Sequence, residues 1–134
     1  MFAVTKPAAM NEMFARAFNS RSIDNLLALY EPDAILKTDA GDGFAAGLAA
    51  IGDALSQLLL APGTMRSANA FCLVHGDIAL LRADWSLSDG DRLIAAGSSA
   101  EIVRRQSDGR WLYVIDHATG ASAESAAAPE ATKY

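Results

Sequence analysis

Apolar side chains recur every three or four positions in the first half of the chain, which is the spacing of one buried helix face. In the first such segment Met10, Phe14 and Phe18 share that face, and Pro7 suits the first helical turn. Ser22 is placed to cap the second segment, which is short. The pattern predicts three helices, over residues 7–18, 23–29 and 48–60.

The second half of the chain alternates apolar and polar residues, which is typical of strands. Asp-Gly pairs in the intervening turns favour hairpins. An earlier glycine-rich stretch, 38–47, is expected to be a loop or a loose hairpin. The predicted strands cover residues 34–37, 65–74, 78–87, 93–105 and 110–119. Helices followed by an antiparallel meander give an α+β fold, with the helices packed on one face of a curved antiparallel sheet.

A chain of 134 residues has the length of one domain. We assign that domain to residues 1–119. Residues 120–134 are small and polar and have no periodicity, so we expect a flexible C-terminal tail there.

The stretch LRADWSL, residues 81–87, leaves one question open. If the face of Trp85 packs into the core, Arg82 and Asp84 form an ion pair in water. If that face instead covers the outside of a dimer-forming sheet, Arg82 and Asp84 lie inside, on the wall of a pocket. Alternation alone does not choose between these two placements.

Charge and hydropathy narrow the class of partner. The formal net charge is −5, which argues against binding to nucleic acid or to an anionic membrane surface. The longest apolar run, 58–62, is far too short to span a bilayer. The first residues lack the layout of a signal peptide, so we expect a cytoplasmic protein.

The sequence offers little for metal binding. The single Cys72 stands in an apolar strand, where a buried and unreactive thiol is the expectation. No pair of cysteines or histidines has zinc-ligand spacing. We therefore expect neither a metal nor a cofactor.

The order of elements and three sequence stretches resemble the nuclear transport factor 2-like (cystatin-like) superfamily. More specifically, they resemble its SnoaL-like and ketosteroid isomerase-like members. The stretches are FNSRSIDNLLALYEPDAIL (18–36), GLAAIGDAL (47–55) and DGRWLYVIDHAT (108–119). The resemblance implies a cone-shaped fold whose open end holds a small apolar molecule, and a homodimer formed through the outer face of the sheet.

The ketosteroid isomerase template fits poorly. That enzyme uses an aspartate base and an oxyanion hole made of a tyrosine and a protonated aspartate. The position of its tyrosine holds Phe14, the position of its base falls at Thr38 beside Asp39, and its second acid falls near Glu101. Phenylalanine cannot donate a hydrogen bond, so steroid isomerisation is not expected unless Asp39 reaches the pocket.

Limonene epoxide hydrolase gives a closer match. Its Arg-x-Asp element corresponds to Arg82 and Asp84, and its second aspartate corresponds to Asp116. The resemblance implies Asp116 as base and Asp84 as acid, with Arg82 orienting both. Tyr30 and Asn69 are candidates for the residues that position its water.

Further residues are expected to line the pocket. Val114 has the same strand parity as Asp116, and Glu101 is either a pocket acid or the partner of an arginine on a neighbouring strand. Phe14 and Tyr30 are expected mainly in the core, with a secondary role in contacting substrate. The alternative for Asp116 is that it lies at the end of its strand with its carboxylate in water rather than in the pocket.

Together these observations predict a SnoaL-like small-molecule enzyme, acting as hydrolase, isomerase or cyclase through acid–base carboxylates. The alternative is a ligand-binding or dimerisation module that has the same fold and no catalytic activity.

Overall fold

The computed structural model describes residues 2–38 and 42–123, and it contains the helices and strands that the sequence predicts. A short 3₁₀ turn, Pro7–Ala9, leads into the first helix. The helices are α1 (Met10–Asn19), α2 (Ile23–Leu27) and α3 (Gly47–Leu58). The strands are β1 (Tyr30–Lys37), β2 (Phe44–Ala46), β3 (Thr64–His75), β4 (Ile78–Asp89), β5 (Arg92–Ser98), β6 (Ala100–Arg105) and β7 (Trp111–His117).

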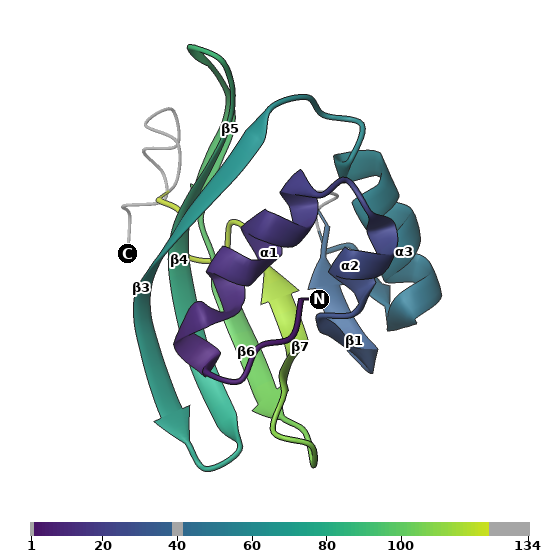
Figure 1. The fold of residues 1–134 in the computed structure, drawn as a ribbon, viewed down its shortest axis with the longest axis vertical. Coiled ribbons are helices and arrows are strands. Elements are labelled where there is room, and N and C mark those ends of the chain that lie inside the picture. Colours follow the sequence, from purple (N-terminus) through teal and green to yellow (C-terminus); the bar gives the residue numbers. More distant parts are fainter. Residues whose placement is uncertain (1, 39–41, 124–134) are drawn as a thin grey trace.

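The strands form one sheet in the order β2-β1-β7-β6-β4-β3, with β5 paired to β4 (Figure 1). Every pairing is antiparallel except that of β1 with β7, which is parallel. The expected purely antiparallel sheet is therefore wrong at this pairing. A parallel pair requires a long connection, and here the whole of the chain between β1 and β7 provides it.

The predicted strand 93–105 is divided into β5 and β6 at Ser99. The Ser99 N–H donates to the Ala83 carbonyl at 2.8 Å, and the Ser99 hydroxyl accepts from the Ala83 N–H at 2.9 Å. One half of β4 pairs with β5 and the other half with β6. The division lets the sheet bend while Ser99 and Glu101 keep their side chains buried.

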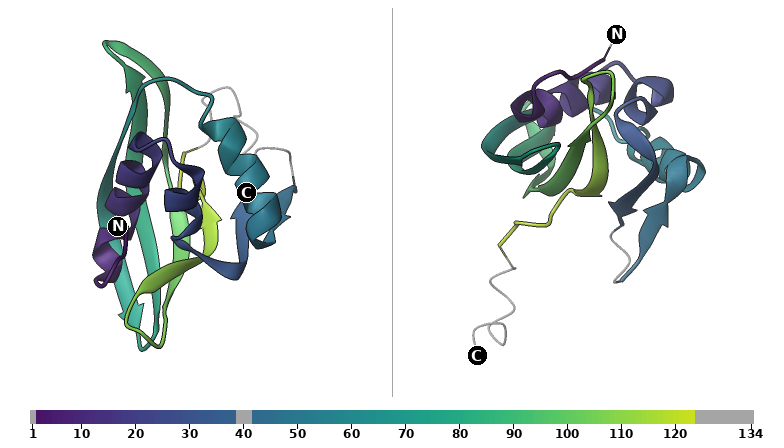
Figure 2. Two further views of the ribbon diagram at one scale, coloured as in Figure 1. Left: turned by 45° about the vertical axis from the view of Figure 1, so that its right-hand side comes forward. Right: turned by 90° about the horizontal axis from the view of Figure 1, so that it is seen from below.

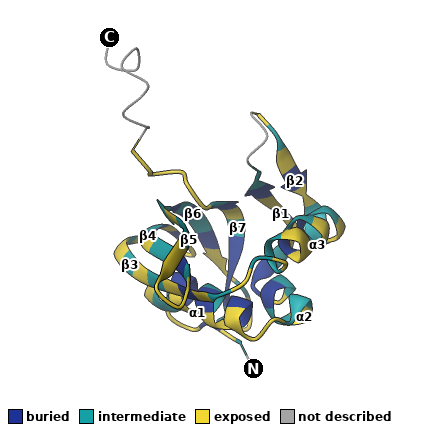
Figure 3. Ribbon diagram, turned by 90° about the horizontal axis from the view of Figure 1, so that it is seen from above, coloured by how far each residue is buried: buried dark blue, intermediate teal, exposed yellow. Residues whose placement is uncertain are grey.

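The sheet curves around the helices, which fill its concave side (Figures 2 and 3). The α1 helix packs against β3, and α3 packs against β1. The core lies between these layers. Its large, fully buried side chains include Met10, Phe18, Leu26, Ile51, Leu81, Val103 and Tyr113. The prediction of an α+β cone fold is confirmed.

The connection between α1 and α2 is tied to the end of α3. Arg21 has a positive φ of 61°, and its guanidinium donates to the carbonyls of Leu59 (3.0 Å), Ala61 (2.6 Å) and Gly63. Ser22 caps α2 as predicted, since its hydroxyl accepts from the Asn25 N–H at 3.4 Å. These contacts hold the helices in place over the sheet.

The segment after β7 remains attached to the sheet as far as it is described. The Ala121 N–H donates to the Ser98 carbonyl at 3.0 Å, and the Ser98 N–H donates to the Ser122 hydroxyl at 2.8 Å. The predicted flexible tail otherwise falls on residues 124–134, outside the described ranges. Within those ranges, no helix is both long and apolar enough to cross a membrane.

Candidate functional site

A cavity of about 260 Å³ opens between the concave face of the sheet and the helices. This volume is close to the lower end of those of small-molecule pockets. Its apolar lining consists of Phe14, Leu36, Ala54, Leu55, Leu58, Met65, Trp85, Leu87, Ala95, Tyr113 and Ala118. Its polar lining consists of Asn11, Lys37, Thr38, Ser67, Ser99, Glu101 and Asp116. The cavity therefore suits a largely apolar molecule that carries a few polar atoms.

Two carboxyl groups from neighbouring strands line this cavity side by side. Glu101 on β6 and Asp116 on β7 are direct cross-strand partners. Their residues are only 3% and 6% exposed, respectively. Two carboxylates at adjacent buried positions repel each other, so the pair favours a state in which one of them keeps its proton.

A β-bulge in β7 turns Asp116 into the cavity. Tyr113 pairs with Val103, whereas Ile115 pairs with Ile102, so Val114 is an extra residue without a partner on β6. Tyr113 and Asp116 consequently share the inner face although they are three positions apart. Val114 is not among the residues that line the cavity, so its predicted pocket role is wrong. The bulge is the reason, because it breaks the alternation that would place Val114 and Asp116 on one face.

Asp116 is supported from behind by Tyr30. The Tyr30 hydroxyl donates a hydrogen bond to Asp116 Oδ2. Tyr30 is buried, is not among the residues that line the cavity, and packs on the Tyr113 ring with centroids 5.0 Å apart. The expectation that Tyr30 contacts the substrate is therefore wrong. Tyr30 contacts Asp116 instead.

Glu101 is held by a residue that the sequence analysis did not identify. Asn11 on α1 is buried, and its Nδ2 donates to Glu101 Oε1 at 2.9 Å. The Tyr113 hydroxyl donates to Asn11 Oδ1 at 2.7 Å. A signal was present in the sequence: Asn11 stands four positions before Ala15 and seven before Phe18, on the buried face of the helix.

The surroundings of the two carboxyl groups shift their proton affinities by different amounts. Burial, and then the charge of Asp116, raise the pKa of Glu101 to about 8, against the opposing hydrogen bonds of Ser99 and Asn11. Burial raises the pKa of Asp116 to about 6, and the hydrogen bond from Tyr30 acts in the opposite direction. Both shifts oppose a doubly ionised pair, so near neutral pH the pair favours a state with one proton and one negative charge. The larger upward shift is that of Glu101.

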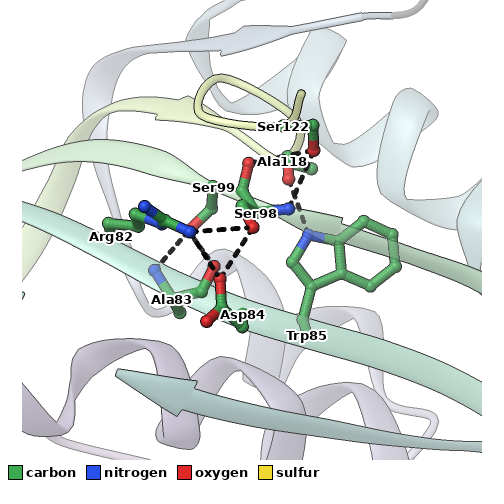
Figure 4. A network of polar contacts seen from close by, with 8 residues as sticks. All are labelled: Arg82, Ala83, Asp84, Trp85, Ser98, Ser99, Ala118 and Ser122. Atoms are coloured by element: carbon green, nitrogen blue, oxygen red, sulfur yellow. Dashed lines mark hydrogen bonds and ion pairs between the residues drawn. The ribbon is translucent and has the colours of Figure 1, made fainter. Parts of the chain in front are cut away.

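Arg82 and Asp84 lie on the opposite, outer face of the sheet, and neither lines the cavity. Figure 4 shows the polar contacts between them. Their neighbours Leu81 and Ala83 are buried, and the Asp84 side chain is 60% exposed. Arg82 Nη2 donates to Asp84 Oδ1 at 3.2 Å. The expectation that this pair shares the cavity with Asp116 is wrong, because the alternation places Leu81 and Ala83, not the charged residues, against the core.

The environment of Asp84 also opposes a role as proton donor. The Ser98 hydroxyl donates to Asp84 Oδ1 at 2.7 Å, and this bond and the one from Arg82 lower the pKa of the carboxyl. Asp84 is therefore ionised at neutral pH. The Arg-x-Asp arrangement of limonene epoxide hydrolase is not assembled around this cavity.

The remaining candidates have mixed placements. Phe14 lines the cavity as expected, and Thr38 does so as well. Asn69 contacts Asn11 and is not among the lining residues. Asp39 lies outside the described residues. Trp85 covers part of the cavity wall, and its Nε1 donates to the Ala118 carbonyl at 2.6 Å (Figure 4).

In the described part of the chain, no three histidine, cysteine or acidic side chains gather in a way that could hold a metal ion. What the cavity offers is a carboxylate next to a carboxylic acid in an apolar enclosure. This arrangement can accept a proton from one atom of a bound molecule and donate a proton to another.

The fold is shared with many solved structures. A protein from Thiobacillus denitrificans, provisionally assigned as a calcium/calmodulin-dependent protein kinase type II association domain, superimposes with a TM-score of 0.75 at 22% identity, covering 90% of this chain and 98% of that one. An NTF2-like protein of unknown function from Shewanella oneidensis gives a TM-score of 0.69 at 16% identity, with coverages of 82% and 93%. A provisionally assigned dehydratase of the NTF2-like family from Streptomyces avermitilis gives 0.68 at 16% identity, with coverages of 87% and 92%.

No curated protein matches the sequence. The family model of the SnoaL-like domain matches residues 11–114, a range that contains α1 through most of β7 and reaches the bulge that precedes Asp116. The chain is therefore a member of the SnoaL-like domain family, with an NTF2-like fold.

Proposed function

We propose that this protein is a small-molecule enzyme that moves a proton within a largely apolar substrate, with Asp116 as general base and Glu101 as general acid. The observation that carries the proposal is the adjacent pair of buried carboxyl groups in the cavity. Asp84 and Arg82 have no part in it, because they lie on the other face of the sheet.

The roles follow from the contacts of each carboxyl group. Ionised Asp116 takes a proton from a carbon or from a water molecule, while Glu101 donates a hydrogen bond or a proton to an oxygen of the substrate. A substrate with an acidic C–H next to a carbonyl group satisfies both requirements, as do the substrates of isomerisation, dehydration and aldol-type cyclisation. The apolar walls exclude water and so strengthen the interaction of Glu101 with the developing charge.

Deuterium exchange tests this proposal even though the product of the reaction is not identified. A panel of apolar cyclic ketones and enones is screened for binding by thermal shift, and the binders are incubated with the protein in D₂O. We expect NMR to show exchange at the carbon next to the carbonyl with wild-type protein, and no exchange above the buffer rate with Asp116→Asn. Ligands that enter the cavity but exchange no faster than in buffer would favour the non-catalytic binding module instead.

We also propose that the protein forms a homodimer through the outer face of the sheet. Apolar residues on that face form one continuous row of cross-strand partners that crosses five strands: Leu73, Leu80, Ile102, Ile115 and Ile35. Leu73 is 66% exposed and Leu80 is 38% exposed in the single chain. Covering this row with a second copy of the chain would bury apolar area that the helices do not reach.

Light scattering after size-exclusion chromatography tests the dimer. Leu73→Lys and Leu80→Glu each place a charge in the row and are expected to yield monomers. Leu60→Lys is the matched control, because Leu60 is also exposed but follows α3, away from the sheet. A wild-type protein that elutes as a monomer would refute this arrangement without affecting the assignment of Asp116 and Glu101.

A further inference from the structure

The side-chain amide of Asn11 uses all of its hydrogen-bonding groups inside the protein. Nδ2 donates to Glu101 Oε1 at 2.9 Å and to Asn69 Oδ1 at 3.4 Å. Oδ1 accepts from the Tyr113 hydroxyl at 2.7 Å. The amide thus links α1, β3, β6 and β7 at the wall of the cavity.

A backbone carbonyl sets the direction of these bonds. Asn69 Nδ2 donates to the Phe71 carbonyl at 3.0 Å, at a bulge where the register of β3 against β4 shifts. A carbonyl oxygen can only accept, so the oxygen of the Asn69 amide must face Asn11. Asn11 must then present its nitrogen to Asn69, and the same nitrogen reaches Glu101.

We propose that Asn69 is a positioning residue that orients the Asn11 amide from the β3 bulge and thereby assigns the proton of Glu101 to Oε2. Oε1 accepts a hydrogen bond from Asn11 and cannot donate one back to its nitrogen. Oε2 is the oxygen left to carry the proton. The catalytic consequence rests on the proposed function, since a fixed proton position gives the substrate a donor of defined direction.

The Asn11 amide could also bind in the opposite orientation. The orientation that Asn69 selects therefore matters for the protonation of Glu101. With the amide turned over, Asn11 Oδ1 would accept from protonated Glu101 and Nδ2 would donate to the Tyr113 oxygen. The Tyr113 hydroxyl hydrogen could then use the Met10 carbonyl, which is 3.4 Å away. The observed orientation favours ionised Glu101, whereas the turned orientation favours its protonated form.

Loss of Asn69 should therefore raise the pKa of Glu101. The other groups that act on this carboxyl are Asp116 from β7 and Ser99 from the residue before β6. Tyr30 and Tyr113 also face it, and its charge raises the pKa of both hydroxyls. None of these is altered by a substitution at Asn69, so the change can be attributed to the Asn11 amide.

The experiment is a ¹³C NMR titration of the Glu101 carboxyl in the ligand-free protein. We expect Asn69→Leu to raise its apparent pKa by about half a pH unit or more. Ser67→Ala is the matched control, because Ser67 lies two residues away on the same strand and lines the cavity; it should leave the pKa near the wild-type value. An unchanged or lowered pKa in Asn69→Leu would overturn the proposal.

A second measurement uses the wild-type protein alone and therefore does not depend on how a variant folds. Both hydrogens on Asn11 Nδ2 should exchange slowly with solvent. Those of Asn25 are the comparison, since among the described residues its side chain is bonded only at the exposed Ser20 hydroxyl. Rapid exchange of either Asn11 hydrogen would contradict the assigned orientation. Both measurements are made without substrate, so they can succeed or fail independently of the deuterium-exchange test of catalysis.

Discussion

Glu101 and Asp116 stand directly opposite each other on adjacent strands, and each is held by a different partner: Asn11 for Glu101 and Tyr30 for Asp116. The two partners are supplied by different elements, α1 and β1. Chemically similar groups therefore have different proton affinities, which is a requirement for one acid and one base acting together.

Asp116→Asn should abolish most of the activity on a substrate identified by deuterium exchange. General-base catalysis contributes about 10²–10⁴-fold to the rate, so a fall in kcat of that size is expected. Asp84→Asn is the matched control, because it makes the same chemical change on the outer face and should alter kcat by less than about twofold. Equal losses in both variants would indicate that neither carboxylate is the base.

The pH dependence of kcat/KM should be bell-shaped. The proposed function requires ionised Asp116 and protonated Glu101, so activity should rise through about pH 6 and fall through about pH 8. In Glu101→Gln the amide cannot lose a proton, so the decline on the alkaline side should disappear while the rise on the acidic side remains. A steady-state pH series on both proteins makes this measurement. Persistence of the alkaline decline in the variant would assign it to another group.

Tyr30→Phe should move the acidic limb of the same profile to higher pH. The hydrogen bond from Tyr30 lowers the pKa of Asp116, so its removal lets burial raise that pKa further. A ¹³C titration of the Asp116 carboxyl checks the prediction directly. Tyr113→Phe is a useful comparison, since the Tyr113 hydroxyl donates to Asn11 rather than to Asp116.

Stability should fall as the pH rises. The pKa is raised in the folded protein from 4.5 to about 8 for Glu101 and from 3.8 to about 6 for Asp116. At pH values between the ordinary and the raised pKa of each group, the folded protein therefore binds more protons than the unfolded chain. The stabilisation is complete below about pH 4 and is lost as the pH rises through about 6 and then about 8. Urea unfolding should show Glu101→Gln gaining stability relative to wild type between about pH 5 and about pH 9. At about 1.4 kcal/mol per pKa unit, the relative gain is of the order of a few kcal/mol.

The same unfolding series in Asp53→Asn, which removes an exposed carboxylate on α3, separates this effect from a general response to net charge. A parallel pH dependence in wild type and Glu101→Gln would contradict the prediction.

Gly97→Ala should displace the Trp85 indole from the cavity wall. A Cβ atom at position 97 would lie 3.0 Å from Trp85 Cζ2 and 3.1 Å from Nε1, closer than normal packing allows. The shift would weaken the bond from Nε1 to the Ala118 carbonyl, at a cost of about 1 kcal/mol. Tryptophan fluorescence in a Trp111→Phe background and urea unfolding measure both effects. The neighbouring exposed position gives the control Ala96→Ser, which should change neither.

Periodicity was sufficient to predict the three helices, most of the strands and the α+β class, because it reports which positions are buried, and the resemblance added the cone-shaped fold. Periodicity missed the division of 93–105 into β5 and β6 and the parallel pairing of β1 with β7. It was not sufficient to decide the face of Arg82 and Asp84, since both faces of this sheet carry apolar residues: Leu81 and Leu87 inside, Leu73 and Leu80 outside. For Glu101 the sequence left two alternatives, a pocket acid or the partner of an arginine. Strand alternation could not decide between them, because its hydrogen-bond partner, Asn11, comes from α1. Contacts across such sequence distances are set by packing, not by local pattern.

The bulge at Val114 decides on which face of the sheet Asp116 lies. In a regular strand of the same sequence, Tyr113 and Asp116 would face opposite sides of the sheet, and the carboxylate would lie on the outer surface. Deleting Val114 would remove the bulge and leave both side chains on the inner face, now two positions apart. A relative that lacks this residue therefore keeps the aspartate inside the cone. One that retains the spacing of three but pairs regularly has that aspartate on the outer face, even though it aligns without a gap.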